Sequence, residues 1–164
     1  MATTTDQDSN PSGDRYDVWV TVLVQRVTEA GDEVASALSG LLPQLSSTAA
    51  PLTADDIARL IAHPGVTLLV ARVDGRIVGT LTLVRFPLPT GERARIEDVV
   101  VDESARGQGV GAALTTEAMR LTEEFGVRTV DLTSRPSREA ANRLYRRLGF
   151  QERDSRVYRF ARDH

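Results

Sequence analysis

A glycine-rich turn at residues 107–111 is the feature that most limits how this chain folds, because it joins a strand pattern to a helix pattern. Before the turn, the compact apolar run Val99–Val101 predicts a buried strand. After it comes an apolar stripe typical of an amphipathic helix, with Val110, Leu114, Ala118, Leu121 and Phe125 spaced three and four residues apart. Strand, glycine turn and helix in this order predict an α/β protein.

The turn also predicts a ligand. The start of a helix carries backbone N–H groups without helical partners and the positive end of the helix dipole. Glycines there let the backbone approach a phosphate or pyrophosphate closely. Arg106, directly before the first glycine, adds a planar fork of donors that suits phosphate oxygens. Tight packing is the alternative explanation, but three glycines at alternate positions behind an arginine exceed what packing requires.

A dinucleotide site is a weaker interpretation of the same turn. Gly107-x-Gly109-x-x-Ala112 resembles the glycine fingerprint that opens a nucleotide-binding βαβ unit. That fingerprint normally begins a doubly wound domain, with an acidic residue at the end of the next strand. Here only about a third of the chain follows the turn, which is too short for the rest of such a domain.

The composition excludes several classes of chemistry. The chain has no cysteine, so disulfides, thiolate metal sites and a cysteine nucleophile are excluded. Its two histidines, His63 and His164, lie far apart, and no metal site is predicted. No apolar run reaches the roughly 18 residues of a membrane helix, and no signal peptide is recognisable. We therefore expect a cytoplasmic protein without a membrane partner. The net charge of −3 disfavours nucleic-acid binding.

The chain divides into a polar tail and one domain. Residues 1–16 are polar and aperiodic, which predicts a disordered tail, and residues 17–164 are expected to form a single domain. Strand patterns occupy residues 18–24, 66–73, 76–84, 93–101 and 128–134, with two short ones near 150–153 and 157–160. Helix patterns begin near residues 32, 53, 110 and 137. We expect a mixed central sheet of about six to seven strands flanked by about four helices.

Two segments carry the strongest functional signal. Residues 99–111 have the pattern Val-x-Val-Asp-x-x-x-Arg-Gly-x-Gly-x-Gly, and residues 140–150 have the sequence Ala-Ala-Asn-Arg-Leu-Tyr-Arg-Arg-Leu-Gly-Phe. In order and spacing they resemble the GNAT superfamily of N-acetyltransferases, over roughly residues 18–162. The family's acyl-CoA pattern, Arg/Gln-x-x-Gly-x-Gly/Ala, is matched by Arg106, Gly109 and Gly111. The resemblance implies the GNAT fold and acetyl-CoA as co-substrate.

By the same resemblance, backbone groups hold most of acetyl-CoA. The N–H groups of the turn contact the pyrophosphate with help from Arg106, and the backbones of Val99 and Val101 pair with the pantetheine arm. The N–H of Val99 also serves as an oxyanion donor to the thioester oxygen. The predicted acetyl-CoA residues are Val99, Val101, Arg106, Gly107, Gln108, Gly109, Val110, Gly111, Ala112 and Asn142. Asn142 is included because Arg138 occupies the position of a CoA-binding asparagine found in many members.

Two residues are candidates for proton transfer. The resemblance implies that Tyr145 protonates the departing CoA sulfur; packing of this tyrosine against the sheet is the alternative. Glu97 lies two residues before Val99 and is expected on the same strand face, where a carboxylate would help to free the acceptor amine. A sheet-edge ion pair is the alternative for Glu97. Asp98 is expected to point the other way and to be structural.

The resemblance implies an enzyme that transfers acetyl from acetyl-CoA to a primary amine of a small molecule, by direct attack in a ternary complex. A protein or peptide N-acetyltransferase and a non-catalytic acyl-CoA-binding sensor module are the alternatives. No motif identifies the acceptor. Many relatives dimerise, so a homodimer remains open beside a monomer.

Overall fold

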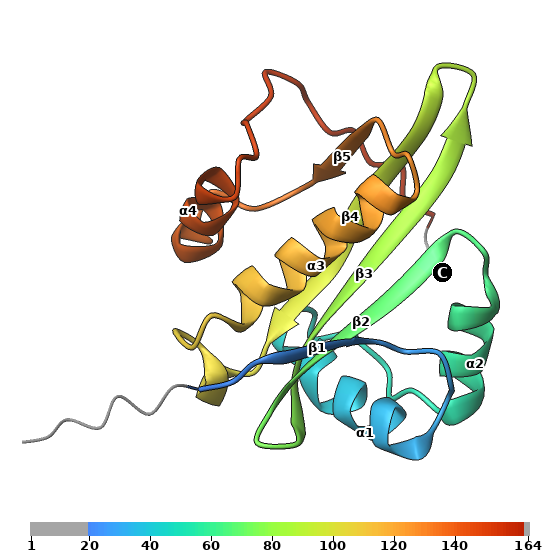
Figure 1. The fold of residues 1–164 in the computed structure, drawn as a ribbon, viewed down its shortest axis with the longest axis vertical. Helices are drawn as coiled ribbons and strands as arrows, with labels where there is room; N and C mark the ends of the chain where they lie inside the picture. Colours follow the sequence, from blue (N-terminus) through green and yellow to red (C-terminus); the bar gives the residue numbers. More distant parts are fainter. Residues whose placement is uncertain (1–19, 163–164) are drawn as a thin grey trace, which may run out of the picture.

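The computed structural model describes residues 20–162, so the tail predicted at residues 1–16 lies outside the described part of the chain. Within this part, five strands form one sheet in sequence order (Figure 1). They are β1 (Leu23–Arg26), β2 (Val66–Val73), β3 (Arg76–Leu88), β4 (Gly91–Val101) and β5 (Thr129–Leu132). The first four are antiparallel neighbours, and β5 runs parallel to β4. The sheet is therefore mixed, as predicted.

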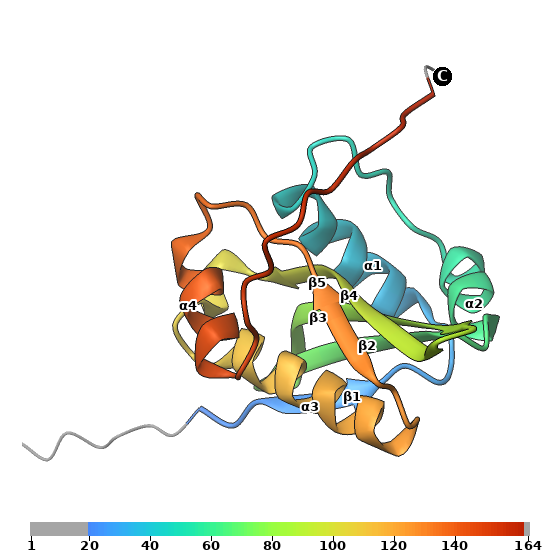
Figure 2. The same cartoon turned by 90° about the horizontal axis from the view of Figure 1, so that it is seen from above.

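Helices cover both faces of this sheet, and Figure 2 shows the sheet between them. The α-helices are α1 (Asp32–Leu41), α2 (Ala54–Ala62), α3 (Val110–Glu124) and α4 (Glu139–Arg147); two 3₁₀ turns are η1 (Leu42–Gln44) and η2 (Glu103–Ala105). One apolar cluster joins α1 and α2 to β2, and a second joins α3 to β2, β3 and β4. The four α-helices in residues 20–162 agree with the predicted number.

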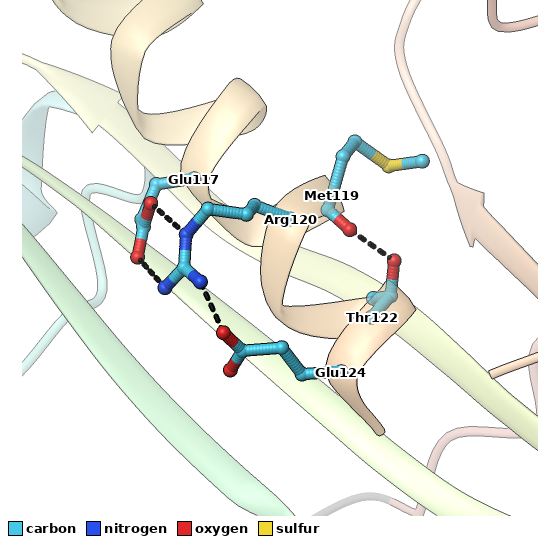
Figure 3. Close-up of polar contacts among 5 residues, drawn as sticks. All are labelled: Glu117, Met119, Arg120, Thr122 and Glu124. Carbon is cyan, nitrogen blue, oxygen red and sulfur yellow. Dashed lines mark hydrogen bonds and ion pairs between the residues drawn. The ribbon is translucent and has the colours of Figure 1, made fainter. Parts of the chain in front are cut away.

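The predicted stripe of α3 is its buried side. Val110, Leu114, Ala118 and Leu121 are all 5% exposed or less. On the solvent side, Arg120 lies between two glutamates (Figure 3). Its Nε and Nη2 lie 2.8 and 2.7 Å from the carboxylate oxygens of Glu117, and its Nη1 contacts Glu124. The helix thus has one apolar and one charged face, which fixes how it lies on the sheet.

Two short-range predictions are confirmed. β2 and β3 form a hairpin around Asp74 and Gly75, whose φ angles of 49° and 79° suit a two-residue turn with both central residues at positive φ. Gly79 marks a close approach of the backbone to α3, because a Cβ there would lie 2.8 Å from Cγ1 of Val110. Since α3 connects β4 to β5, these two strands are parallel, as the helix crossover requires.

The prediction of six to seven strands is wrong at the C-terminal end. Residues 151–162 form neither helix nor strand, and every one of them is exposed. Val157, Tyr158 and Phe160 are 74%, 86% and 87% exposed. The reason is compositional: Phe150 is followed by three polar residues, and residues 157–160 place only Tyr158 and Phe160 on one face, so neither segment has an apolar face long enough to hold it against the sheet.

The ends of some elements also differ from the sequence pattern. The first strand was expected at residues 18–24, of which 18 and 19 lie outside the described residues. β1 instead spans Leu23–Arg26, and residues 20–22 form no strand. α1 begins at Asp32, as expected, and Gly31 is its N-cap. The last helix begins at Glu139, two residues later than the start expected near residue 137. β3 also runs to Leu88, four residues beyond the expected end. None of these differences changes the order of the elements.

Candidate functional site

The site begins where β4 and β5 separate. β5 pairs with β4 only from Arg93 to Ile96, and its last paired residue is Leu132. Beyond this point β4 continues to Val101, while the chain after β5 turns away toward α4 (Figure 1). Within residues 20–162, the β5-facing edge of β4 therefore has no strand partner after Ile96. This leaves a run of backbone groups that an extended ligand could pair with.

The backbone of β4 presents this open edge at Val99 and Val101. The N–H of Asp102 donates to the carbonyl of Val78, 2.8 Å away, and therefore points toward β3. Because successive N–H groups of a strand point to opposite sides, the N–H groups of Val101 and Val99 point toward the open side. Both side chains pack against the cluster under α3. The two valines thus have the orientation that the sequence interpretation requires.

The glycine turn follows this edge after the short turn η2. Gly107 and Gly109 have φ angles of 78° and 82°, which strongly favour glycine. Gly109 precedes α3 without a side-chain cap, and the first helical bond runs from the N–H of Ala113 to the carbonyl of Gly109. The N–H groups of Val110, Gly111 and Ala112 therefore have no helical partner. Three donors and the positive end of a fifteen-residue helix meet at this point.

The side chains around the turn contribute less than its backbone. The guanidinium of Arg106 is on the surface, with Nη2 3.6 Å from Oε1 of Glu103. Gln108 donates from its amide to the carbonyl of Ser104, 3.2 Å away, which ties the turn to η2. Val110 is buried, and its side chain packs on Gly79. A ligand at the turn would therefore meet backbone N–H groups first, with Arg106 beside them.

The second sequence motif lies next to the turn. A Cβ on Gly111 would lie 3.3 Å from Cδ2 of Leu144, so α4 packs closely against the start of α3. Tyr145 follows Leu144 and makes an edge contact with Phe150, with the ring centroids 5.8 Å apart. Burial raises the pKa of the Tyr145 hydroxyl, and the charge of Arg138 opposes part of the rise. The tyrosine is therefore protonated at neutral pH.

Asn142 is engaged in the loop before α4. Its side-chain amide donates to the carbonyl of Arg135, 3.0 Å away, and lies 3.5 Å from that of Pro136. These contacts hold the chain that leads into the helix. Arg138 stands at the N-terminal end of the same helix. The amide nitrogen of Asn142, a residue predicted to contact CoA, thus stabilises the loop, and the side-chain carbonyl oxygen is the group left for a ligand.

A bulge in β4 changes the direction of the two acidic residues before Val99. Thr82 pairs with Glu97 and Thr80 pairs with Val100, so β4 has one residue more than β3 in this interval. Asp98 takes up the difference with a φ of 49°. The bulge breaks the two-residue alternation on which the expected common face of Glu97 and Val99 was based.

Glu97 and Val99 consequently lie on opposite faces of the sheet. Thr82, opposite Glu97, lines a cavity under α1 and α2, whereas Val99 packs on the α3 side. Oε1 of Glu97 accepts a hydrogen bond from Nε of Arg95 at 2.8 Å. The ion-pair alternative for Glu97 therefore describes its contact in the structure.

Asp98 lines a cavity, a position that the sequence interpretation did not foresee. It was expected to be structural, yet it lines the cavity under α1 and α2 together with Thr80 and Thr82. A usable signal was present: two acidic residues followed by three valines do not fit a regular alternation of buried and exposed positions. Such a break in a strand pattern is typical of a bulge, although its exact place depends on pairing with the neighbouring strand.

Comparisons with known proteins agree with this geometry. Residues 34–150 match the model of the Acetyltransferase (GNAT) family, and the chain belongs to this family. A glucosamine 6-phosphate N-acetyltransferase of Trypanosoma brucei brucei is 40% identical over 86 residues, which cover 51% of this chain and 56% of the relative. The L-amino acid N-acetyltransferase AaaT of Escherichia coli K12 is 30% identical over 94 residues, which cover 57% of this chain and 58% of the relative. The matches thus span little more than half the length of either relative.

The fold has solved counterparts as well. A crystal structure of an acetyltransferase from Trypanosoma brucei superposes with a TM-score of 0.71 at 28% identity, covering 86% of this chain and all of that chain. Enzymes of the GNAT family use acetyl-CoA as co-substrate.

Between residues 20 and 162, no helix is long and apolar enough to cross a membrane. Nor does this part of the chain bring three His, Cys, Asp or Glu side chains together as metal ligands.

Proposed function

We propose that this protein is an N-acetyltransferase that moves the acetyl group of acetyl-CoA to a primary amine of a small molecule, by direct attack in a ternary complex. One observation carries the proposal: the open edge of β4 is followed, after η2 and the glycine turn, by the N–H groups without helical partners at the start of α3. An extended arm ending in a pyrophosphate matches this order of strand edge and anion site. Membership of the family supports the same ligand.

In the proposed complex, the pantetheine arm lies along Val99 and Val101, and the pyrophosphate contacts the N–H groups from Gln108 to Ala112. Arg106 exchanges its loose contact with Glu103 for a phosphate oxygen. Gly107, Gly109 and Gly111 allow the close approach. The carbonyl oxygen of Asn142 is the proposed contact from α4, since its amide is engaged with the loop.

The reaction forms one bond and breaks one. The amine nitrogen bonds to the thioester carbonyl carbon, and the carbon–sulfur bond then breaks, which gives the N-acetylated amine and CoA. The N–H of Val99 stabilises the negative oxygen of the tetrahedral intermediate; one such donor typically contributes about 3 kcal/mol. Tyr145 gives its phenolic proton to the departing thiolate. The nitrogen, which is positively charged after the attack, loses one proton to solvent, and solvent returns a proton to the Tyr145 phenolate. Its raised pKa keeps this proton available at neutral pH.

The amine must lose a proton before it attacks. An alkylammonium has a pKa of about 10, so at pH 7 a carboxylate, acting directly or through water, helps to remove its proton. We propose Glu97 for this role. It would have to share its carboxylate between Arg95 and the amine or a bridging water, because Oε1 accepts from Arg95. The proton released from the ammonium passes to solvent.

The proposal extends to the surroundings of the enzyme. Residues 17–164 would act as a single cytoplasmic domain, without a nucleic-acid or membrane partner, as a monomer or a homodimer. For the acceptor, the names of two relatives point to small molecules: glucosamine 6-phosphate in one and an L-amino acid in the other. These names support a small amine over a protein acceptor.

A thiol-release assay tests this function. Acetyl-CoA is incubated with a panel of amino sugars, amino acids, polyamines and peptides, and acetyl-CoA binding is measured in parallel by calorimetry. Tyr145→Phe should lower kcat at least tenfold and leave the Kd for acetyl-CoA unchanged, because general-acid catalysis typically contributes ~10²–10⁴-fold. Tyr158→Phe is the matched control, because Tyr158 is 86% exposed and should have no effect. An absence of acetyl-CoA binding would overturn the proposal.

A further inference from the structure

A small cavity of about 200 Å³ lies between α1, α2 and the sheet. Five leucines from α1, η1, α2, β2 and the loop before α2 form most of its wall; Leu38 and Leu68 are 2% and 1% exposed. The sheet side is completed by Thr80, Thr82 and Asp98. The cavity is therefore apolar on the helix side and polar where β3 and β4 border it.

The wall of the cavity carries only negative charge. Among the residues that line the cavity, Asp98 is the only ionisable one. The hydroxyl of Thr80 donates to the carbonyl of Leu69, 3.0 Å away, so toward a ligand it can only accept a hydrogen bond. A phosphate or a carboxylate would find no cation in this wall. An ammonium group would find a carboxylate, and an apolar body would find the leucines.

The bulge places this carboxylate next to the proposed acetyl site. Asp98 has a φ of 49° and lines the cavity, whereas its neighbour Val99 belongs to the open edge of β4. Adjacent Cα atoms are about 3.8 Å apart. A nitrogen held by Asp98 would thus lie near the N–H of Val99 proposed to hold the thioester oxygen. The bulge therefore places the cavity residue Asp98 directly before Val99, the residue proposed to contact the thioester.

We infer that the acceptor is a small primary amine with a compact apolar body, which fills the cavity under α1 and α2 while its ammonium group contacts Asp98. This inference rests on the proposed acetyltransferase function and specifies its substrate class. It assigns Asp98 as an acceptor-binding residue. The inferred acceptor differs from a phosphorylated amino sugar. A phosphate group would be repelled by Asp98, the one charged residue that lines the cavity.

The test compares three amines in the thiol-release assay: 3-methylbutylamine, ethanolamine and glucosamine 6-phosphate. The value of kcat/KM should be at least tenfold higher for 3-methylbutylamine than for the other two. Leu60→Phe, which adds bulk to the cavity wall, should reduce the rate with 3-methylbutylamine more than with ethanolamine. Equal rates with all three, a preference for the phosphorylated sugar, or no turnover of 3-methylbutylamine would overturn the inference.

A pair of matched variants tests Asp98 itself. Asp98→Asn removes the charge but keeps a residue that tolerates positive φ, and it should raise the KM for 3-methylbutylamine at least tenfold without changing the KM for acetyl-CoA. Asp74→Asn is the control, because Asp74 has the same φ of 49° in the β2–β3 hairpin. An unchanged amine KM in Asp98→Asn would overturn the assignment.

The two proposals fail in different ways. If calorimetry shows acetyl-CoA binding and Tyr145→Phe slows the acetylation of some other amine, the proposed function stands and the apolar acceptor is wrong. If acetyl-CoA does not bind at all, the proposed function fails, and the substrate class inferred from it is overturned too.

Discussion

At the scale of single residues, two glycines illustrate opposite requirements. Gly109 has a φ of 82°, and a Cβ there would meet no atom within 4 Å, so backbone conformation alone requires glycine. Gly40, near the end of α1, has the same free space but no positive φ. The conformational freedom of glycine is needed in the turn, and it is a cost in the helix.

The first prediction contrasts these two positions. Gly109→Ala should lower the free energy of unfolding by about 1–2 kcal/mol and weaken acetyl-CoA binding, because the left-handed conformation becomes strained and the donors at the helix start shift. Gly40→Ala should raise the free energy of unfolding by about 0.5–1 kcal/mol and leave binding unchanged. Urea denaturation and calorimetry measure the two effects. Tighter binding in Gly109→Ala would contradict the role given to the turn.

The second prediction concerns pH and Tyr145. An ordinary tyrosine has a pKa of about 10. Burial raises the pKa of the Tyr145 hydroxyl, so its acid form persists to a higher pH. As the pH rises, kcat should therefore show no loss attributable to Tyr145 until the pH exceeds the ordinary tyrosine value. A pH profile of wild type and Tyr145→Phe measures this. An alkaline fall near pH ~8 that is present in wild type and absent from the variant would contradict it.

At the scale of elements, α3 is positioned by its contact with β3. A Cβ on Gly79 would lie 2.8 Å from Cγ1 of Val110 and 3.1 Å from Cδ1 of Leu114. It would also lie 3.2 Å from the carbonyl oxygen of Val100, which belongs to β4. The glycine thus lets the helix lie close to the sheet at the end that carries the anion site.

The third prediction follows from this contact. Gly79→Ala should lower the free energy of unfolding by about 1–3 kcal/mol, because the added methyl forces side chains of α3 or the backbone to shift. Since the displaced helix carries the glycine turn, the Kd for acetyl-CoA should rise as well. Gly31→Ala is the control, because a Cβ there would meet no atom within 4 Å. If Gly79→Ala matches Gly31→Ala in both stability and Kd, the close approach does not position the helix.

The same elements show what sequence can predict. The stripe of α3 and the hairpin at Asp74 and Gly75 depend on neighbouring residues, through helical period and φ preference, and both were predicted correctly. The bulge at Asp98 depends on how β4 aligns with β3, which no residue of β4 determines alone. The expected common face of Glu97 and Val99 therefore failed, and the cavity could not be foreseen. The proposed roles of Tyr145 and Glu97 remain predictions.

At the scale of the whole molecule, residues 151–162 stand apart from both clusters of the core. Each of their side chains is exposed, whereas Phe150, the residue before them, packs against the α3 cluster. Their one ion pair to the rest of the structure joins Arg146 to Glu152 at 3.4 Å, with both side chains more than half exposed. Such a surface pair contributes little to stability. The folded core therefore ends, in energetic terms, at Phe150.

The fourth prediction removes this segment. A chain ending at Phe150 should unfold within about 2 °C of the full chain, because no apolar surface of the segment is buried in the fold. Phe150→Ala in the full chain should lower Tm by more, because its ring packs against Tyr145 and the core. Thermal denaturation and sedimentation velocity measure both variants. A fall of more than about 5 °C on truncation would show that Val157, Tyr158 and Phe160 are covered in solution. Sedimentation then shows what covers these side chains. If the full chain is a dimer and the truncated chain a monomer, a second copy of the chain covers them. If both are monomers, they pack on the sheet of their own chain.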